Sequence, residues 1–142
     1  MNKSLHLMKL SVGSESVASL AKWQATRAAQ ARDGLPRHVT RMWPRREAEL
    51  LDGGSIYWVI RGFIRARQRI LRLDEADLGD GIRRCALVLD PELVSTAATP
   101  RRPFQGWRYL QAADAPADLT HAGEDGDLSP QLLAALAEIG VR

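Results

Sequence analysis

Cysteine is nearly absent from the chain, and long hydrophobic runs are missing altogether. A single cysteine among 142 residues excludes a disulfide framework, and because Cys85 stands in the apolar run C-A-L-V-L we expect a buried, unreactive thiol. No apolar run approaches the ~20 residues that a membrane span needs, and the N-terminus lacks a charged segment followed by a long apolar stretch. We therefore expect a cytoplasmic protein without a membrane partner.

The signatures of common catalytic, cofactor and metal sites are missing as well. The chain contains no G-x-S-x-G nucleophile motif and no G-x-x-x-x-G-K phosphate loop. Its three histidines are scattered and, with one cysteine, give no metal-ligand spacing. His6 falls in an apolar strand pattern and is interpreted as a hydrogen-bonded core residue. We therefore predict no catalytic residue, cofactor or metal from motifs.

Lysine is scarce too, because seventeen of the twenty basic residues are arginine. Residues 1–36 carry five basic and two acidic groups, residues 37–108 carry fourteen and nine, and residues 109–142 carry one and six. A basic body with an acidic tail predicts either that the tail lies against the basic face or that it stays mobile. A GC-rich genome would favour arginine codons, but codon usage does not explain clustering on one face.

The length fits one domain that can bury a proper core without disulfides or a metal. Alternating patterns and turn residues predict an α+β fold, with a small, mostly antiparallel β-sheet or a partly open barrel and flanking helices. The predicted strands are 5–12, 37–43, 55–60, an arginine-bearing strand after a bend or bulge at Gly62, and 83–89, with a second bulge near Ile70 and an acidic loop at 73–81. The predicted helices are one capped by Ser14 that ends at Asp33, a short one at 45–51, and a C-terminal one at 129–142. Residues 100–110 read as a structured loop or short helix, and 111–128 as a linker within the single domain 1–142.

The stretch 61–73, R-G-F-I-R-A-R-Q-R-I-L-R-L, is the most informative part of the chain. Because side chains alternate between the faces of an extended strand and repeat about every 6.6 Å on each face, one face should gather guanidinium groups and an aromatic ring. The residues predicted to share that face are Arg61, Phe63, Arg65, Arg67 and Arg69. Repulsion between them demands a counter-charge. This is either a bound polyanion or the acidic loop and tail, which would make a salt-bridged surface of small net value.

Large rings interleave with arginine in R-M-W-P-R-R (41–46) and R-R-P-F-Q-G-W-R-Y (101–109). Single-stranded nucleic acid sites pair a basic groove with stacking rings, so either segment could provide a platform. We expect Trp43 and Trp107 to be exposed, since charge and proline flank them, and Trp58 and Phe104 to lie in the core. The candidate nucleic-acid or anion-binding residues are Arg41, Trp43, Arg45, Arg61, Arg65, Arg67, Arg69, Arg101, Arg102, Trp107 and Arg108.

Several longer runs of the chain are distinctive: 37–46, R-H-V-T-R-M-W-P-R-R; 49–62, E-L-L-D-G-G-S-I-Y-W-V-I-R-G; 67–71, R-Q-R-I-L; 81–93, G-I-R-R-C-A-L-V-L-D-P-E-L; and 101–110, R-R-P-F-Q-G-W-R-Y-L. These runs resemble a bacterial family known as domain of unknown function 1489, which implies no activity. The order of elements around the aromatic strand also resembles, more weakly, the PUA-like folds that include EVE and ASCH domains. That resemblance implies a cleft for a nucleotide or modified base, with aromatic rings for stacking and arginines for phosphate.

Two main functional hypotheses follow. In the first, the protein is a binding module for RNA, single-stranded nucleic acid or a nucleotide, and its affinity falls steeply with salt. In the second, it is a small enzyme acting on an anionic or nucleotide substrate, with His38 or Asp90 as the base. A protein-interaction module is a third alternative.

Overall fold

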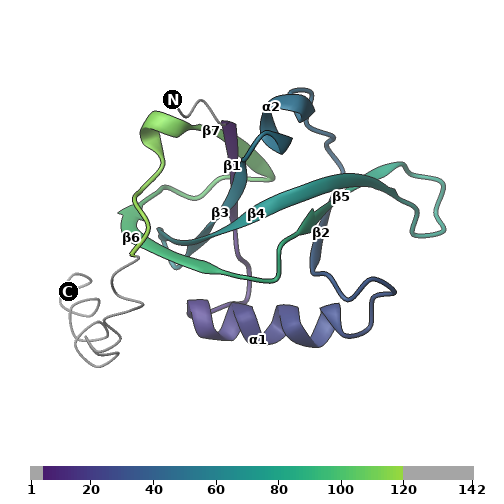
Figure 1. The fold of residues 1–142 in the computed structure, drawn as a ribbon, viewed down its shortest axis with the longest axis horizontal. Helices are drawn as coiled ribbons and strands as arrows, with labels where there is room; N and C mark the ends of the chain where they lie inside the picture. The colour runs from purple at the N-terminus through teal and green to yellow at the C-terminus, as the bar shows by residue number, and fades with distance from the viewer. Residues whose placement is uncertain (1–4, 120–142) are drawn as a thin grey trace.

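The computed structural model describes residues 5–119, which form a curved β-sheet with two helices (Figure 1). The elements in chain order are β1 (Leu5–Leu10), α1 (Val17–Ala28), β2 (Arg37–Thr40), α2 (Glu47–Leu51), β3 (Ser55–Ile60), β4 (Phe63–Ala76), β5 (Arg84–Leu89), β6 (Val94–Pro100), β7 (Trp107–Gln111) and a 3-10 turn, η1 (Ala112–Asp114). No helix within this part of the chain is long and apolar enough to cross a membrane.

Seven strands make one sheet with the order β2-β5-β4-β3-β1-β7, and β6 pairs with β4 beside this path. The pairs are antiparallel apart from β1 with β3. The long strand β4 ties the sheet together: it pairs with β3 and β6 through its first half and with β5 through its second half. The predicted α+β class, with a mostly antiparallel, partly open barrel, is confirmed.

The core has two parts, one on each face of β3. On the larger side, Leu20 of α1 and Leu50 of α2 pack with Ile56, Trp58 and the inward side chains of β5. On the smaller side, Tyr57 and Val59 pack with residues from β4, β7 and the segment after β6. Because β3 is covered on both faces, its six residues are all buried, as its aromatic and β-branched composition predicts.

His6 and Cys85 are both buried, as predicted. The Nδ1 atom of His6 accepts a hydrogen bond from the Ser55 backbone N–H at 3.0 Å. Cys85 is fully buried, and burial raises the pKa of its thiol to about 11.

Helix α1 lies along one side of the sheet (Figure 1) and is shorter than predicted. Its N-cap is Ser16, not Ser14, because the Ser16 side chain accepts from the Ser19 backbone N–H and the Ser19 hydroxyl accepts in return from the Ser16 N–H. The helix ends at Ala28, and Asp33 instead accepts the Leu35 N–H in the following turn. Only one stripe of α1 is buried, formed by Leu20, Gln24 and Ala28.

The predicted arginine face on β4 is wrong in two places. Arg61 does not belong to the strand: with φ of 52° it forms, with Gly62 at 87°, the two-residue turn between β3 and β4. A bulge then places one extra residue, Arg65, between the pairs Val59–Ile64 and Trp58–Ala66. Cross-strand partners share a face, so the slip puts Phe63 and Arg67 on opposite faces. The bulge predicted near Ile70 is confirmed.

Other differences lie at the later strands. Strand β6 was not predicted, and β7 occupies part of the segment expected to be a loop or short helix. Strand β4 continues to Ala76, into the predicted acidic loop. Within the predicted linker, residues 111–119 comprise the end of β7, η1 and a bridge of Asp118 to Thr96 of β6. The rest of that linker and the predicted helix at 129–142 lie outside the described residues.

Candidate functional site

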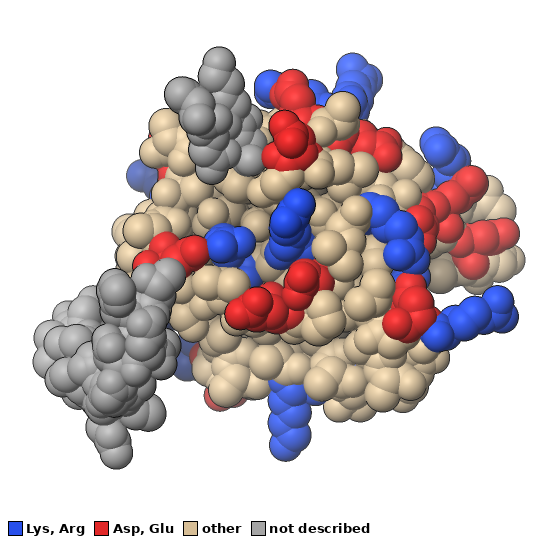
Figure 2. All heavy atoms as spheres, in the orientation of Figure 1, with Lys and Arg blue, Asp and Glu red and all other residues tan. Residues whose placement is uncertain are grey.

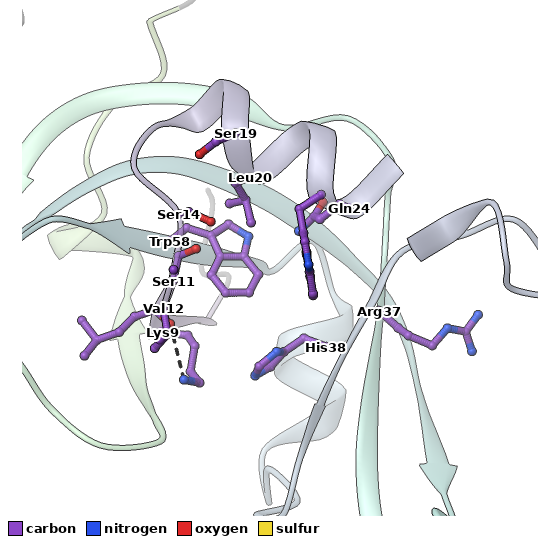
Figure 3. Close-up of a pocket in the computed structure, with 13 residues that line it drawn as sticks. Lys9, Ser11, Val12, Ser14, Ser19, Leu20, Gln24, Arg37, His38 and Trp58 are labelled. Atoms are coloured by element: carbon purple, nitrogen blue, oxygen red, sulfur yellow. Dashed lines mark hydrogen bonds between the residues drawn. The ribbon is translucent and has the colours of Figure 1, made fainter. Parts of the chain in front are cut away.

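A cleft of about 420 Å³ lies beneath α1 (Figure 3). Strand β2 pairs with β5 and not with β1, so space remains between β1 and β2, and α1 roofs it. The cleft is lined by residues 9–14 at the end of β1, Ser19, Leu20, Trp23 and Gln24 of α1, Arg37 and His38 of β2, and Trp58 of β3. Its rings come from Trp23, which is 55% exposed, and from Trp58 and His38.

Of the two charged residues that line the cleft, one has no matching carboxylate within residues 5–119. Its charged lining residues are Lys9 and Arg37. Arg37 is neutralised by Asp33, 2.6 Å away, and Figure 3 shows its side chain pointing away from the cleft. Lys9 forms no ion pair with any carboxylate of residues 5–119, and its Nζ donates only a long hydrogen bond of 3.4 Å to the Leu10 carbonyl. Burial lowers the pKa of the Lys9 amine.

His38 faces the same space with an unsatisfied nitrogen. Its ring packs edge-on against the Trp58 ring, with centroids 5.6 Å apart. Burial, helped by the nearby Lys9 ammonium, lowers the pKa of His38 to about 4, so the imidazole is neutral at physiological pH. Its Nε2 atom is buried and has no hydrogen-bond partner. In Figure 3 both His38 and Lys9 lie below the Trp58 ring, and the Lys9 nitrogen is directed to the Leu10 carbonyl.

A buried amide network fixes the wall of the cleft. Gln68 of β4 accepts from the Trp58 indole N–H at 3.0 Å and donates to the Asp90 carbonyl at 2.9 Å. Gln68 and Gln24 of α1 also exchange two hydrogen bonds of 3.0 and 2.7 Å. The network therefore holds the Trp58 ring in place and fastens α1 over the cleft.

The arginines of β4 do not form an open row. Arg67 makes a two-fold hydrogen-bonded ion pair with Asp118, at 2.7 and 2.8 Å, which raises the pKa of Arg67 and lowers that of Asp118. Arg65 lies over the Phe63 ring at 5.2 Å, and Arg69 is exposed. On the face drawn in Figure 2, basic and acidic side chains are intermixed. For Arg67, the counter-charge is therefore a carboxylate of the protein itself.

The remaining candidate arginines form two groups, one at the β3–β4 turn and one elsewhere on the surface. Arg61 and Arg101 meet at the β3–β4 turn, since the Arg101 N–H donates to the Gly62 carbonyl at 2.9 Å, and Arg102 follows directly. We call Arg61, Arg101 and Arg102 the turn cluster; within residues 5–119 none of them pairs with a carboxylate. The others, Arg41, Arg45 and Arg108, are exposed but line no part of the cleft.

The predicted exposed tryptophans are not the exposed ones. Trp107 is 8% exposed, and its indole N–H donates to the Met42 carbonyl at 3.0 Å, so its predicted exposure is wrong. Trp43 is half-buried under the Arg83 guanidinium, 4.4 Å from its ring. Trp58 lies in the core, as predicted, but its ring also borders the cleft. The tryptophan that is exposed is Trp23, whose exposure the sequence pattern did not predict.

Of the two candidate bases, the cleft includes His38 and not Asp90. The Asp90 carboxylate accepts the Glu92 N–H at 2.9 Å and shapes the turn after β5. In the part of the chain that the structure describes, no three histidine, cysteine, aspartate or glutamate side chains gather as metal ligands.

Comparison with known proteins gives one match. The family described as "Protein of unknown function (DUF1489)" matches residues 7–142, nearly the full length. The chain belongs to this family. No curated protein and no solved structure matches it. For this DUF1489 chain the PUA-like resemblance stays a prediction.

Proposed function

We propose that the protein binds a nucleotide unit, free or within single-stranded RNA or DNA, in the cleft beneath α1. The observation that carries the proposal is Lys9, a cation that pairs with no carboxylate of residues 5–119 and lies in a cleft bordered by aromatic rings. A half-buried ammonium is costly unless a counter-charge meets it, and a bound anion supplies one.

The shape and the polar groups of the cleft favour a planar ligand. Its volume of about 420 Å³ lies within the range of roughly 300–1,000 Å³ typical of small-molecule sites. Bases stack on aromatic side chains for about 1–3 kcal/mol each, and Trp23 offers an exposed ring at the cleft. The unpaired His38 Nε2 offers a hydrogen bond to a ring heteroatom, and leaving such an atom unpaired costs about 1–3 kcal/mol.

The turn cluster supports a ligand longer than one nucleotide. The Ser11 N–H, on the cleft wall, donates to the Val59 carbonyl at 2.9 Å. Val59 precedes Arg61 by two residues, which is about 7 Å along a strand. A single-stranded nucleic acid with one base in the cleft would therefore pass close to Arg61 and its neighbour Arg101. Their guanidinium groups can form bidentate hydrogen bonds with its phosphates.

Tryptophan fluorescence titration tests this. We expect both AMP and a short single-stranded oligonucleotide to quench the tryptophan fluorescence. The oligonucleotide should bind more tightly, and its affinity should fall steeply as the salt concentration rises. Lys9→Gln should weaken both ligands by roughly tenfold or more, since a charge-assisted hydrogen bond contributes about 1.5–3 kcal/mol. Lys22→Gln is the matched control, because Lys22 is exposed on α1 and lines no part of the cleft.

A double variant distinguishes binding of a free nucleotide from binding of a nucleotide within an oligonucleotide. Arg61→Gln/Arg101→Gln should leave AMP affinity unchanged and should weaken the oligonucleotide while flattening its salt dependence. Absence of quenching by either ligand at low salt contradicts the proposal. So does equal weakening by the Lys9 and Lys22 substitutions.

A further inference from the structure

The amine of Lys9 differs from that of an ordinary surface lysine. The chain has three lysines, Lys3, Lys9 and Lys22, of which Lys9 lines the cleft. Its Nζ has one long hydrogen bond and, among the described residues, no carboxylate to hold it as a fixed ammonium. Burial lowers its pKa, which enlarges the fraction of neutral, nucleophilic amine.

A proton carrier lies near this amine, since the charge of Lys9 acts on the His38 ring. Lys9 stands opposite Trp58 in the β1–β3 register, and the His38 ring packs on the Trp58 ring. The imidazole is neutral and its Nε2 is unpaired, so a carbonyl held between Lys9 and His38 has an acid–base group beside it. The cleft is roomy enough to hold that carbonyl and the rest of its molecule.

We propose that Lys9 is a covalent attachment site, where its amine condenses reversibly with the aldehyde or ketone group of an anionic ligand. The inference rests on the proposed function in one respect, that an anionic ligand enters this cleft. The Lys9 nitrogen forms a bond to the carbonyl carbon, and the carbonyl oxygen takes up a proton to give a carbinolamine. Loss of that oxygen as water then leaves a carbon–nitrogen double bond, and His38 exchanges the protons with the nitrogen and the leaving oxygen. No oxidant or reductant is needed.

Imine formation also keeps the electrostatics of the cleft. A protonated imine carries the same single positive charge as the ammonium that it replaces. The attached ligand thus retains an opposite charge next to its anionic group, in a cleft whose other cation, Arg37, is already paired with Asp33. Lys9 serves the same ligand by attraction before condensation and by a covalent bond after it.

Reductive trapping on the full chain tests the inference. The probes are pyridoxal phosphate and periodate-oxidised AMP, both anionic aldehydes, with cyanoborohydride to reduce any imine and peptide mass mapping to locate it. We expect Lys9 to be labelled on the order of tenfold faster than Lys22, because acid–base assistance acts on Lys9 alone. His38→Gln should slow labelling of Lys9 and leave that of Lys22 unchanged. In Lys9→Arg, which keeps the charge, the fast phase should vanish, and circular dichroism verifies that the variant is folded.

The outcomes separate this inference from the proposed function. Fast labelling of Lys9 that AMP does not slow, in a protein that AMP does not quench, supports the covalent site and contradicts nucleotide binding. Quenching by AMP together with equal labelling rates at Lys9 and Lys22 supports nucleotide binding and overturns the covalent site. Fast labelling in Lys9→Arg also overturns it.

Discussion

Replacing Gln68 by methionine should lower the free energy of unfolding far more than the same replacement of its partner Gln24. Gln68 is fully buried, and its side chain joins α1 to the cleft wall through bonds to Gln24, the Trp58 indole and the Asp90 carbonyl. Methionine has a similar volume but no polar atoms, so packing is largely kept. The indole N–H of Trp58 and the Asp90 carbonyl then lose the partner that Gln68 provides.

The size of the effect follows from counting the groups left without a partner. A buried donor or acceptor that loses its partner costs about 1–3 kcal/mol, so Gln68→Met should cost roughly 3–5 kcal/mol of the 5–15 kcal/mol typical of a folded domain. Gln24→Met should cost only about 1 kcal/mol. In that variant, Gln68 keeps its bonds to Trp58 and to Asp90.

Urea unfolding followed by circular dichroism measures both values. The double variant Gln24→Met/Gln68→Met should lose less than the sum of the single variants, because removing both amides leaves fewer orphaned groups. Gln30→Met, an exposed position that follows α1, is the control and should stay within about 0.5 kcal/mol of the parent. Equal, small losses for Gln24→Met and Gln68→Met would refute the reasoning.

Three further predictions concern other parts of the fold. His38 has a pKa of about 4 when folded against 6.5 in the unfolded chain, so the unfolded state takes up the proton first as the pH falls. The free energy of unfolding should therefore fall by about 2 kcal/mol between pH 7 and pH 4.5 because of His38. Urea unfolding at the two pH values measures this fall, and His38→Phe should remove it. A double-mutant cycle with Arg67→Met and Asp118→Asn should give a coupling of about 1 kcal/mol, since the bidentate pair is partly shielded from water; additive losses would show that the pair is not formed in solution. Gly54→Ala should cost roughly 3 kcal/mol or more in thermal unfolding, because its Cβ would collide with backbone carbonyl oxygens of β1 and α2. Gly79→Ala is the control: its Cβ meets open space, so only the strain of its positive φ remains, and it should cost only about 1 kcal/mol.

The sequence predicts the elements whose signal is local. β3 and β5 are continuous apolar runs, and both were found at nearly the predicted bounds. β6, V-S-T-A-A-T-P, has small polar residues and little hydrophobic pattern, and it is a strand because β4 offers it a pairing edge. The bulge at Arg65 likewise depends on how β3 and β4 align, which alternation along one strand cannot reveal.

The candidate site was only partly readable for the same reason. Lys9 did leave a signal, since it is a cation in the row of Leu5 and Leu7 that otherwise faces the core. His38 was considered as a base, but its place beside Trp58 requires β2 to lie across the cleft from β1, which is a non-local arrangement. The exposure of Trp107 was misjudged because its flanking charges say nothing of the Met42 carbonyl that its indole reaches.

Indole resonances of the ¹⁵N-labelled protein test the central claim most directly. The chain has four tryptophans, of which Trp23 and Trp58 line the cleft and Trp43 and Trp107 do not. Each resonance is assigned with a single Trp→Phe variant, and AMP or a short oligonucleotide is then titrated at low salt. The account predicts that the Trp23 and Trp58 indole signals shift with ligand while those of Trp43 and Trp107 stay in place. Shifts confined to Trp43 and Trp107, or no shift of any indole, would contradict it.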